Sequence, residues 1–485
     1  MSTLGKLSVY SVILIHLVLV PLDVTLDFLY PGHLALLGWG GHFVREEKAL
    51  QEQHENLTEA ADEAEQLRDR HFNPWRTPQT EKARAAIRDV AHQLQSYERL
   101  YQLRKRKRRP ADQEAFEATV SAIVSDLMYH HILGHGDGVY ITRSNRYLGC
   151  KSRYRPHAYG KTLPTILDHM ATPEMAFLDM KLGHGDPFGP AMETIIRASK
   201  RLITRVVEAA LELADFSVSP GQEVIQLKRI KKGGWDGGGL EEYKDTSETI
   251  MYREQVQSIN AWLEAAEIDF DENYSPKDRP VDTLDRRLRR VFTQGRFDSG
   301  GRLFGGFWQP LGKEARRKGL MVNGEDMVEL DYGQMNPRIL YGLCGALPPA
   351  GDAYAIPGFL YHRSGVKKVM NSMLFATQRL SRMPKGVGKA FKKRQSVVEV
   401  MTAIEAAHPA ITSCFFTGIG HEAQFTESQV LVDVLLTLRD LGIHALPVHD
   451  SVIVGKSNKD KVREVMLSCF LKGTGVPGIV GVVGE

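Results

Sequence analysis

The sequence contains little cysteine, and this scarcity excludes two classes of protein. Four cysteines are spread over 485 residues, and no two of them stand close enough to form a CxxC pair. A zinc cluster or a framework of disulfides is therefore not expected. The composition fits a reduced, cytoplasmic compartment best. The four positions are Cys150, Cys344, Cys414 and Cys469.

The chain also lacks an excess of charge of either sign. Lys and Arg number 62 against 59 Asp and Glu, which gives a formal net charge of +3. The total charge therefore gives no indication of a nucleic-acid partner. Only the distribution of charge along the chain could indicate one. With 42% hydrophobic and 25% charged residues, the mix is that of an ordinary globular protein rather than a disordered, collagen-like or polytopic membrane protein. Domains of roughly 100–200 residues would allow about two to four units.

Long apolar runs are scarce, and the one near the N-terminus is short. Val9–Leu22 is almost continuously apolar and follows Lys6, but a bilayer span needs about 20 apolar residues. No small-residue cleavage site stands out after it. We interpret the segment as buried or partner-facing. A membrane anchor and a signal peptide are the alternatives, and an anchor would suit a membrane-tethered interaction protein.

The segment from about Val44 to Leu103 is rich in Glu, Gln, Ala, Arg and Leu, with apolar residues at helical spacing. Asn73-Pro74 interrupts it, which predicts a helical hairpin or a short coiled coil. The second helix is expected to begin at about Thr80 and to end in the six cations Arg104–Arg109, before Pro110. Such a run either contacts phosphates or is merely solvated.

Residues 111–270 read as a separate, mostly helical unit. Helices are expected over Asp112–Leu133 and Pro187–Ala214, a strand over Val224–Ile230, and a turn or loop over Lys231–Gly239. Helices followed by a basic hairpin suggest a winged-helix-like, nucleic-acid-binding or thumb region. His130, His131 and His135, and His184 with Asp186, could suggest a metal site. Histidines beside glycines are usually polar loop residues, and no carboxylate stands at matching spacing, so metal binding is not expected there.

Cations and aromatic residues alternate in one part of this unit. Cations combined with aromatic faces suit a nucleic-acid backbone and its bases, although a solvated pair of surface strands would look the same. The residues are Arg143, Arg146, Tyr147, Lys151, Arg153, Tyr154 and Arg155.

Three segments in the last 200 or so residues carry chemistry, and the first is Met327–Leu343. Met327–Leu330 has the pattern of a strand, Asp331 stands at its end, and Pro337 begins a helical stretch. A carboxylate at a strand terminus that faces a cleft is a natural metal ligand.

The second segment, His362–Ala376, predicts a helix with one polar face. Arg363, Lys367, Asn371 and Phe375 follow one another at intervals of four, which puts them on the same side of a helix. Cations for phosphates and a flat ring for a base suit a nucleoside triphosphate. From Arg363 to Arg394 there are ten Lys or Arg and no Asp or Glu, the charge pattern of a polyanion site.

The third segment, Gly442–Val454, predicts a β-hairpin. Two short apolar runs flank His449-Asp450-Ser451, so Asp450 would lie at the tip and could lie beside Asp331 on a neighbouring strand. Paired carboxylates that hold two divalent ions are what in-line phosphoryl transfer needs. Mg²⁺ is the expected ion, because it prefers carboxylates and substrate phosphates; Mn²⁺ is possible.

Together the segments resemble motifs A, B and C of the clan that unites family A DNA polymerases and single-subunit phage and mitochondrial RNA polymerases. Asp331-Tyr332-Gly333-Gln334 with Arg338 is similar to DYSQxExR; Arg363-x3-Lys367-x7-Phe375-Ala376 to RxxxK with an aromatic-Gly pair; and Val448–Ser451 to VHDE or HDS. A fourth match lies upstream, in Asp298–Phe304, Gln309–Gly312 and Lys318–Leu320. The resemblance covers residues 282–485.

The resemblance implies an α+β fold: a mostly helical N-terminal part, then a right-hand polymerase core with an antiparallel-sheet palm and reduced fingers. The expected units are an apolar segment and helical hairpin (1–110), the thumb or winged-helix-like region (111–270), and palm and fingers (271–485). Motifs A, B and C would span 327–343, 362–376 and 446–454. A compact phage or mobile-element enzyme would fit.

The resemblance also implies a role for each matching residue. Asp331 and Asp450 would bind the metal ions, Lys367 and Arg363 the triphosphate, and His449 the primer terminus. Nucleotide contacts are expected from Tyr332, Gln334, Asn336, Asn371 and Phe375. Nucleic-acid contacts are expected from Arg302, Arg338, Glu427, Gln429, Lys385, Lys389, Lys392, Lys393 and Arg394.

Departures from the family pattern leave the sugar preference open. Asn336 replaces a Glu that blocks a ribose 2′-hydroxyl in the DNA enzymes, whereas Phe375 lacks the hydroxyl with which the RNA enzymes select ribonucleotides. We favour DNA synthesis slightly. An RNA polymerase or primase is the alternative, and an inactive nucleic-acid-binding relative is a second. No carboxylate set predicts a proofreading exonuclease upstream.

Overall fold

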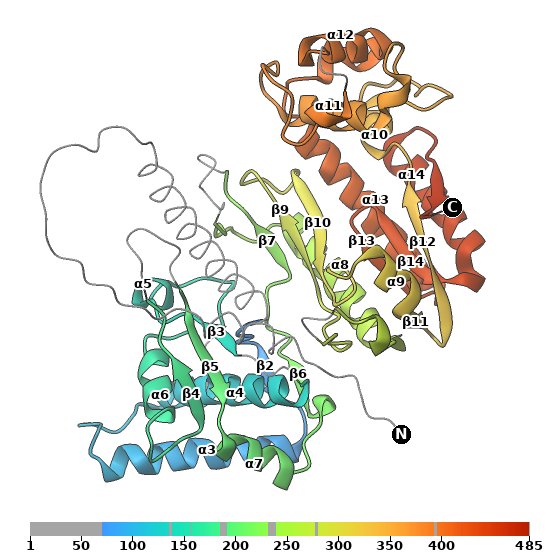
Figure 1. Ribbon diagram of the computed structural model, residues 1–485. Helices are drawn as coiled ribbons and strands as arrows, with labels where there is room; N and C mark the ends of the chain where they lie inside the picture. Colours follow the sequence, from blue (N-terminus) through green and yellow to red (C-terminus); the bar gives the residue numbers. More distant parts are fainter. Residues whose placement is uncertain are drawn as a thin grey trace, which may run out of the picture. The chain divides into compact units, whose positions relative to one another are not determined.

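The protein is described by a computed structural model (Figure 1) over residues 70–134, 138–156, 158–184, 192–230, 239–276, 280–391 and 395–484. These residues form helices and several sheets, and the α+β class expected from the sequence is confirmed. Val9–Leu22 and the first helix of the expected hairpin lie outside them. In the described ranges, no helix combines the length and the apolarity that crossing a bilayer requires.

The first hydrophobic cluster unites residues from Phe72 to Phe216, which we call the N-terminal lobe. Its four-stranded sheet has the order β1-β3-β5-β4, and β2 pairs with β6. The strands are β1 Arg70–His71, β2 Arg76–Pro78, β3 Val139–Ile141, β4 Leu178–Lys181, β5 Thr194–Ala198 and β6 Phe216–Val218. The helices are α3 Glu81–Leu100, α4 Pro110–Ile132, α5 Asn145–Leu148, α6 Leu163–Met170 and α7 Lys200–Glu208.

Helix α3 begins and ends where local chemistry directs. The Thr80 side chain caps it by accepting from the Ala83 amide, a favourable N-cap. The stripe of Ile87, Val90 and Leu94 is buried in the lobe, as helical spacing predicts.

The basic run Arg104–Arg109 does not end the second helix, which was the expectation. Helix α3 stops at Leu100, and Arg109 is the extended N-cap of α4. The residue before a proline is biased away from the helical conformation, and Pro110 is well suited to start a helix. Arg108 pairs with Glu98 at 2.7 Å, so the run is not wholly solvated.

Two more predictions for this region differ from the structure. Thr194–Ala198 is strand β5, not helix, because a β-branched run favours a pleated sheet; α7 covers only Lys200–Glu208. The strand expected over Val224–Ile230 exists as β7, Ile225–Leu227, but it pairs with β9, Leu288–Phe292, which lies beyond residue 270. That pairing does not fit a winged-helix-like unit for residues 111–270.

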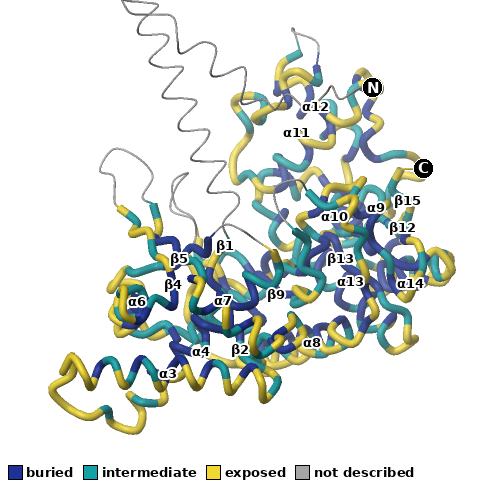
Figure 2. Tube along the Cα trace, turned by 60° about the horizontal axis from the view of Figure 1, so that its bottom comes forward, coloured by how far each residue is buried: buried dark blue, intermediate teal, exposed yellow. Residues whose placement is uncertain are grey.

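A second cluster unites buried residues from Val224 to Val476, which we call the C-terminal core. Strands β7, β9 and β10 form one sheet, and β13-β14-β12-β11-β8 form another, in which β15 also pairs with β12. Since β7, α8 and β8 share this cluster, a unit boundary near residue 270 does not coincide with a break in the core. Figure 2 shows buried backbone where α13 meets β13.

The remaining elements of the core can be given by their bounds. The strands are β8 Ile268–Phe270, β9 Leu288–Phe292, β10 Gly300–Gly305, β11 Leu320–Val322, β12 Glu325–Tyr332, β13 Ala445–Val448, β14 Ser451–Gly455 and β15 Val480–Val482. The helices are α8 Ser247–Glu264, α9 Lys313–Gly319, α13 Gly420–Asp440 and α14 Lys459–Thr474.

A third, smaller cluster contains α10 Met335–Leu343, α11 Arg363–Phe375 and α12 Val397–Ala407. Its buried side chains include Val366, Met370 and Met373 of α11. These face the cluster, and the positions between them on α11 remain outside. The second chemical segment is therefore a helix with one buried and one exposed side, as its pattern predicts.

Candidate active site

The two aspartates expected to act together lie at the same end of two neighbouring antiparallel strands, Asp331 in β12 and Asp450 in the turn before β14. In the pairing of β12 with β14, Asp331 is the Cα partner of Ser451, the residue after Asp450. The hairpin predicted for Gly442–Val454 is confirmed, with β13 and β14 paired from Val448–Ser451 outward. Asp450 occupies the turn, so the topology brings the two carboxylates to one end of the sheet.

Backbone strain and side-chain bonds define the turn that carries Asp450. His449 has φ +57°, a left-handed conformation that is uncommon for residues other than Gly, although His adopts it more readily than most, as Asn and Asp do. The strand before it is fixed by Trp308 Nε1 and Gln309 Nε2, which donate to the Pro447 carbonyl at 2.9 and 3.1 Å. The upstream string that contains Gln309 therefore supports the hairpin directly.

The electrostatics of Asp331 show that the two carboxylates interact. Burial, and then the negative charge of Asp450, raise the pKa of Asp331 to about 7. Lys367 and Lys313 oppose this rise. Two carboxylates that disfavour each other's charge are characteristic of functional sites.

Glu329 is an acid of this region that the sequence analysis did not single out. It precedes Asp331 by two residues on β12, and so lies on the same face of the strand. Arg316 pairs with it at 3.1 Å, and the Ser451 hydroxyl donates to its Oε1 at 2.8 Å. Alternation along the strand could have indicated it. Because Arg316 neutralises it, Glu329 anchors the strand ends and is not a third free carboxylate.

Helix α11 presents its cations beside an acid that the sequence analysis also missed. Arg363 donates to Asp352 through Nε at 2.5 Å and Nη2 at 3.2 Å. The charges of Arg363 and Lys367 lie 5.2 and 6.0 Å from the ring centroid of Tyr354. Both cations are exposed, and Lys367 is close enough to Asp331 to oppose the rise of its pKa.

Two asparagines join the first and second segments. Asn336 Nδ2 donates to Asn371 Oδ1 at 3.2 Å. Gln334, which has φ +58°, precedes α10, and its Oε1 accepts from the Ala353 amide at 2.9 Å. Two predicted nucleotide-binding residues, Asn336 and Asn371, are thus joined directly, whereas Gln334 is held by the Ala353 amide between α10 and α11.

Phe375 lies at the end of α11 and remains 38% exposed. Its ring packs edge-on against His421, with 5.1 Å between centroids. A Cβ on Gly420 would come within 2.9 Å of the Phe375 ring, so the glycine permits the close approach. The ring is therefore held in place while part of it faces solvent.

Arg302 and Glu427, predicted to contact nucleic acid separately, bind each other. Arg302 donates to Glu427 through Nε at 2.6 Å and Nη2 at 2.9 Å. Burial raises the pKa of Glu427 against the opposing charge of Arg302, and the charge of Asp450 raises it further. The pair thus lies near the aspartates. Glu427 is buried, so its side chain does not face a groove.

Gln429 likewise serves an internal contact. Arg290, which is fully buried, donates to Gln429 Oε1 at 3.0 Å and to the Ser428 hydroxyl at 3.2 Å. Burial lowers the pKa of Arg290 to about 10.

Two predicted contact residues are core residues instead. Tyr332 is buried, and its hydroxyl donates to the Met466 carbonyl at 2.6 Å. Arg338 is buried and donates to the Pro477 carbonyl at 2.8 Å. Side-chain alternation on β12 turns Tyr332 away from the face that carries Asp331. Neither side chain is available to a nucleotide or to nucleic acid.

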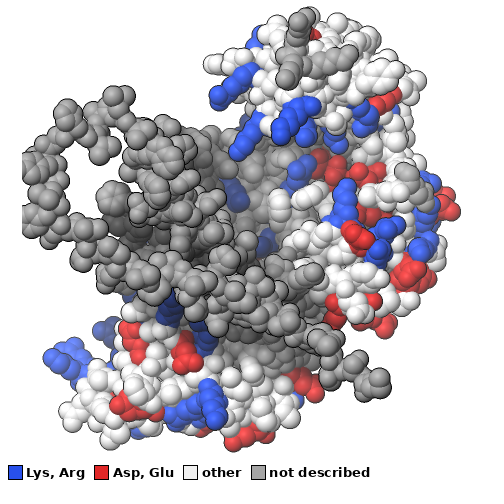
Figure 3. Space-filling model, in the orientation of Figure 1, with Lys and Arg blue, Asp and Glu red and all other residues white. Residues whose placement is uncertain are grey.

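The basic segment after α11 is exposed where it is described. Lys368, Arg382, Lys385 and Lys389 are exposed, with no ion-pair partner in the described ranges, while Arg379 pairs with Glu405 at 2.6 Å. Lys392, Lys393 and Arg394 lie outside these ranges. Figure 3 shows Lys and Arg side chains gathered around this part of the molecule.

The donor set limits how a metal could be held. Within the described ranges there is no group of three or more His, Cys, Asp and Glu that could hold a metal ion. Asp331 and Asp450 are the carboxylates available to a metal at this site, because Glu329 is paired with Arg316. Mg²⁺ is usually bound by one or two carboxylates together with water and substrate phosphates, so the pair fits a divalent ion that arrives with its substrate.

Comparisons with known proteins show only a weak similarity to solved structures. No known protein family and no curated protein matches the chain. Among solved structures, it is similar to the POL domain of Pol1 from M. smegmatis, a complex with DNA primer-template and dNTP. The TM-score is 0.26 and the identity 10%, over 82% of this chain and 77% of the other.

Proposed function

We propose that the protein is a template-directed nucleotidyltransferase, a nucleic-acid polymerase. The observation that carries the proposal is the pairing of β12 with β14, which brings Asp331 beside the turn that holds Asp450. Burial and the charge of Asp450 raise the pKa of Asp331, and a bound cation would stabilise its negative form. This supports a cation-binding site. Here the C-terminal sheet is the palm, and the small cluster with α11 is the reduced fingers.

Asp331 and Asp450 would hold the divalent ions, which lower the pKa of a hydroxyl and neutralise a leaving pyrophosphate. The rest falls to the protein's own groups. Lys367, exposed and near Asp331, would bind the triphosphate. Arg363 would do so only if it left or shared Asp352, which holds it now. Phe375 would stack on a base.

Within this proposal, Glu427, Tyr332 and Arg338 support other parts of the protein and do not contact the substrate. Arg302 and His449 keep their expected contacts. The Arg302–Glu427 pair would orient the Arg302 guanidinium toward the primer or template while Glu427 stays buried. Tyr332 and Arg338 would support the palm from inside. His449, exposed beside Asp450 and edge-on to Phe304 at 6.3 Å, would touch the primer terminus.

DNA synthesis is favoured slightly. The DYxQ string is closer to the DNA enzymes, and Phe375 lacks a hydroxyl for a ribose. The short Asn336, held by Asn371, supports the alternative of ribonucleotide use by an RNA polymerase or primase. One assay separates these possibilities.

The test is extension of a labelled primer on DNA and RNA templates, with Mg²⁺ and either dNTPs or NTPs, and again without a primer. We expect incorporation by the wild-type chain and a loss of at least about 10³-fold in Asp450→Asn. Unchanged binding of primer-template by the variant would show that the fold is intact. No incorporation with any substrate would leave the inactive, nucleic-acid-binding alternative.

A further inference from the structure

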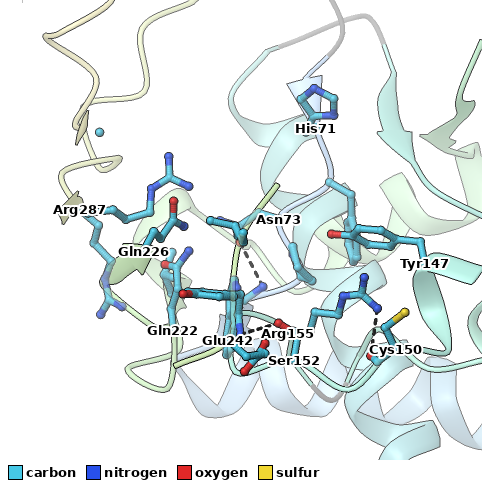
Figure 4. Close-up of a pocket in the computed structure, with 18 of the residues that line it drawn as sticks. His71, Asn73, Tyr147, Cys150, Ser152, Arg155, Gln222, Gln226, Glu242 and Arg287 are labelled. Carbon is cyan, nitrogen blue, oxygen red and sulfur yellow. Dashed lines mark hydrogen bonds between the residues drawn. The ribbon is translucent and has the colours of Figure 1, made fainter. Parts of the chain in front are cut away.

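A polar cavity of about 710 Å³ lies at a junction of the N-terminal lobe and the C-terminal core (Figure 4). One wall comes from the lobe, around Asn73–Trp75 and Tyr147–Arg155. The other comes from the sheet of β7, β9 and β10, around Gln226, Arg289 and Gly305. Its volume is that of a site for a ligand of small-molecule size. The proposed reaction uses none of these residues.

The lining carries more positive than negative charge. Its cations are Lys151, Arg155, Arg287 and Arg289, and its acids are Glu242 and Asp285. Glu242 already accepts from the Arg153 amide at 3.2 Å. Asp285 is exposed, and Arg289 lies close enough for its charge to oppose the rise in the pKa of Asp285 that desolvation and Asp282 cause.

Two of the four cations are engaged, and two are not. Arg287 donates to Glu264 at 2.8 Å and to the Ser219 carbonyl at 3.0 Å. Arg155 donates to the Cys150 carbonyl at 3.0 Å. Lys151 and Arg289 are exposed, and no described residue forms an ion pair or hydrogen bond with either side chain. Both side chains therefore keep their hydrogen-bond donors for an anion, although the charge of Arg289 also acts on the neighbouring Asp285.

The cavity also offers flat faces and free amides. The Arg155 guanidinium lies 3.7 Å from the ring centroid of Tyr147, so the planar pair is held in place while Tyr147 stays 47% exposed. Trp75 lines the same space. The side-chain amides of Gln222 and Gln226 have no hydrogen-bond partner in the described ranges. Aromatic faces suit bases, and amides suit base edges.

Strand β10 connects this cavity to the candidate active site. Gly305, its last residue, lines the cavity. Phe304 lies edge-on to His449, and Arg302 pairs with Glu427. At about 3.3 Å per residue, the cavity begins about 10 Å along the strand from Arg302. That distance is on the order of a few nucleotide steps of a single strand.

We propose that this cavity binds a single-stranded stretch of the nucleic acid whose end occupies the active site. Phosphates contact Lys151 and Arg289, and a base lies on Tyr147 or Trp75. This assignment gives a function to the part of the basic and aromatic run that lines the cavity, Tyr147, Lys151, Tyr154 and Arg155, whereas Arg143 and Arg153 pair with Asp168 and Asp245. The choice of ligand rests on the proposed polymerase function. A single nucleotide would fill only part of the cavity. It could not extend along β10 to the candidate active site.

The test compares two double variants of the full chain that remove the same charge. Lys151→Gln with Arg289→Gln neutralises the cavity. Lys200→Gln with Lys472→Gln neutralises two exposed cations elsewhere and is the control. The probe is fluorescein-labelled dT12 or rU12, and its fluorescence anisotropy is measured from 50 to 300 mM salt without divalent ions.

We expect the cavity variant to bind about 10-fold more weakly than wild type at low salt. The slope of log affinity against log salt should fall by about 1.4, for two phosphate contacts on a single strand. The control should remain within about twofold. Equal affinity of the two double variants, with equal melting temperatures, would overturn the proposal. So would AMP competing as well as an unlabelled oligonucleotide.

A second readout avoids any effect of charge. Irradiation of an oligonucleotide that carries 5-iodouracil should cross-link it to Tyr147 or Trp75, as located by mass spectrometry. Tyr147→Leu should lower the yield, and cross-links confined to other segments would contradict the assignment. Because neither experiment needs turnover, a chain that fails to extend primers can still pass both, and the two proposals can fail separately.

Discussion

Arg302 and Glu427 form a bidentate ion pair at 2.6 and 2.9 Å, in which the Glu427 side chain is 1% exposed and that of Arg302 is 29% exposed. The two residues lie 125 positions apart in the sequence, Arg302 in β10 and Glu427 in α13. Removal of one partner from a buried pair leaves an uncompensated charge, which costs about 3–5 kcal/mol. Replacement of both partners by apolar residues can be much less costly.

Arg302→Met should therefore destabilise the protein more than the double change Arg302→Met with Glu427→Leu. The pKa of Glu427, already raised by burial, should rise further without Arg302. A raised carboxyl pKa means that stability is lost as the pH rises, so the loss in Arg302→Met should be larger at pH 8 than at pH 5. Urea unfolding at both pH values measures this. A double variant that loses the sum of both single losses would contradict the coupling.

The burial of Asp331, together with the nearby charge of Asp450, predicts a stability that depends on pH. The pKa of Asp331 is raised from its ordinary value to about 7, so the folded protein binds more protons than the unfolded chain between about pH 4 and pH 7. Stability in EDTA should therefore fall over that window by about 1–2 kcal/mol, after allowance for solvent screening. Asp331→Asn should remove most of this fall.

Thermal melts in EDTA, from pH 4.5 to pH 8, test the prediction. Asp326→Asn is the control, because that aspartate is exposed and pairs only with the exposed Lys456. At pH 8, Mg²⁺ should raise the melting temperature of wild type more than that of Asp331→Asn. Identical pH profiles for wild type and Asp331→Asn would show that the pKa of Asp331 is not raised in the folded protein.

The hydrogen bond between Asn336 and Asn371 predicts how sugar choice can be changed, given the proposed function. Asn336→Glu puts a longer, charged side chain beside the nucleotide site and should raise the preference for dNTPs over NTPs by about 10-fold, or 1.4 kcal/mol. Asn336→Gln has the same length without the charge and is the matched control. Steady-state kcat/KM for each substrate measures the preference. A shift of equal size in both variants would assign the effect to length rather than charge.

The three chemical segments could be predicted because each depends on local pattern. A strand that ends in Asp331, a helix with residues at intervals of four, and a hairpin around Asp450 are all readable from periodicity, and the structure contains each one. The sequence also indicates that the two aspartates share a sheet. It does not give the register, which depends on pairing between residues about 120 positions apart.

The failures come mostly from tertiary contacts, which no local pattern shows. Tyr332 and Arg338 match a motif, but alternation and packing turn them inward. Asp352 and Trp308 have no sequence pattern that points to their partners Arg363 and Pro447, whereas alternation along β12 could have indicated Glu329. In the N-terminal lobe, Thr194–Ala198 is only five residues long, too short for periodicity to separate a strand from a helix. Its β-branched residues favour a strand, and pairing with β3 and β4 fixes it as one.

Cys344 and Cys414 give the last prediction, one that the cysteine count does not suggest. Their sulfur atoms lie 3.0 Å apart, at the end of α10 and in the turn Pro409–Cys414. Diamide should oxidise the two thiols to a disulfide, with loss of two hydrogens that reduce diamide to the hydrazine. Burial raises the pKa of the Cys414 thiol to about 11, which leaves it rarely ionised at neutral pH. The reaction should therefore be faster at pH 9 than at pH 7.

A Cys150→Ser background removes the exposed thiol that could join two chains. In it, the intact mass should fall by about 2 Da, and a non-reducing peptide map should contain the 344–414 link. Closing a loop of this size stabilises by about 4 kcal/mol in the chain-entropy treatment, so the melting temperature should rise when the disulfide forms. Reduction by dithiothreitol should reverse the rise. Cys344→Ser should abolish both changes. Full alkylation of both thiols after diamide treatment would show that the sulfur atoms do not approach in solution.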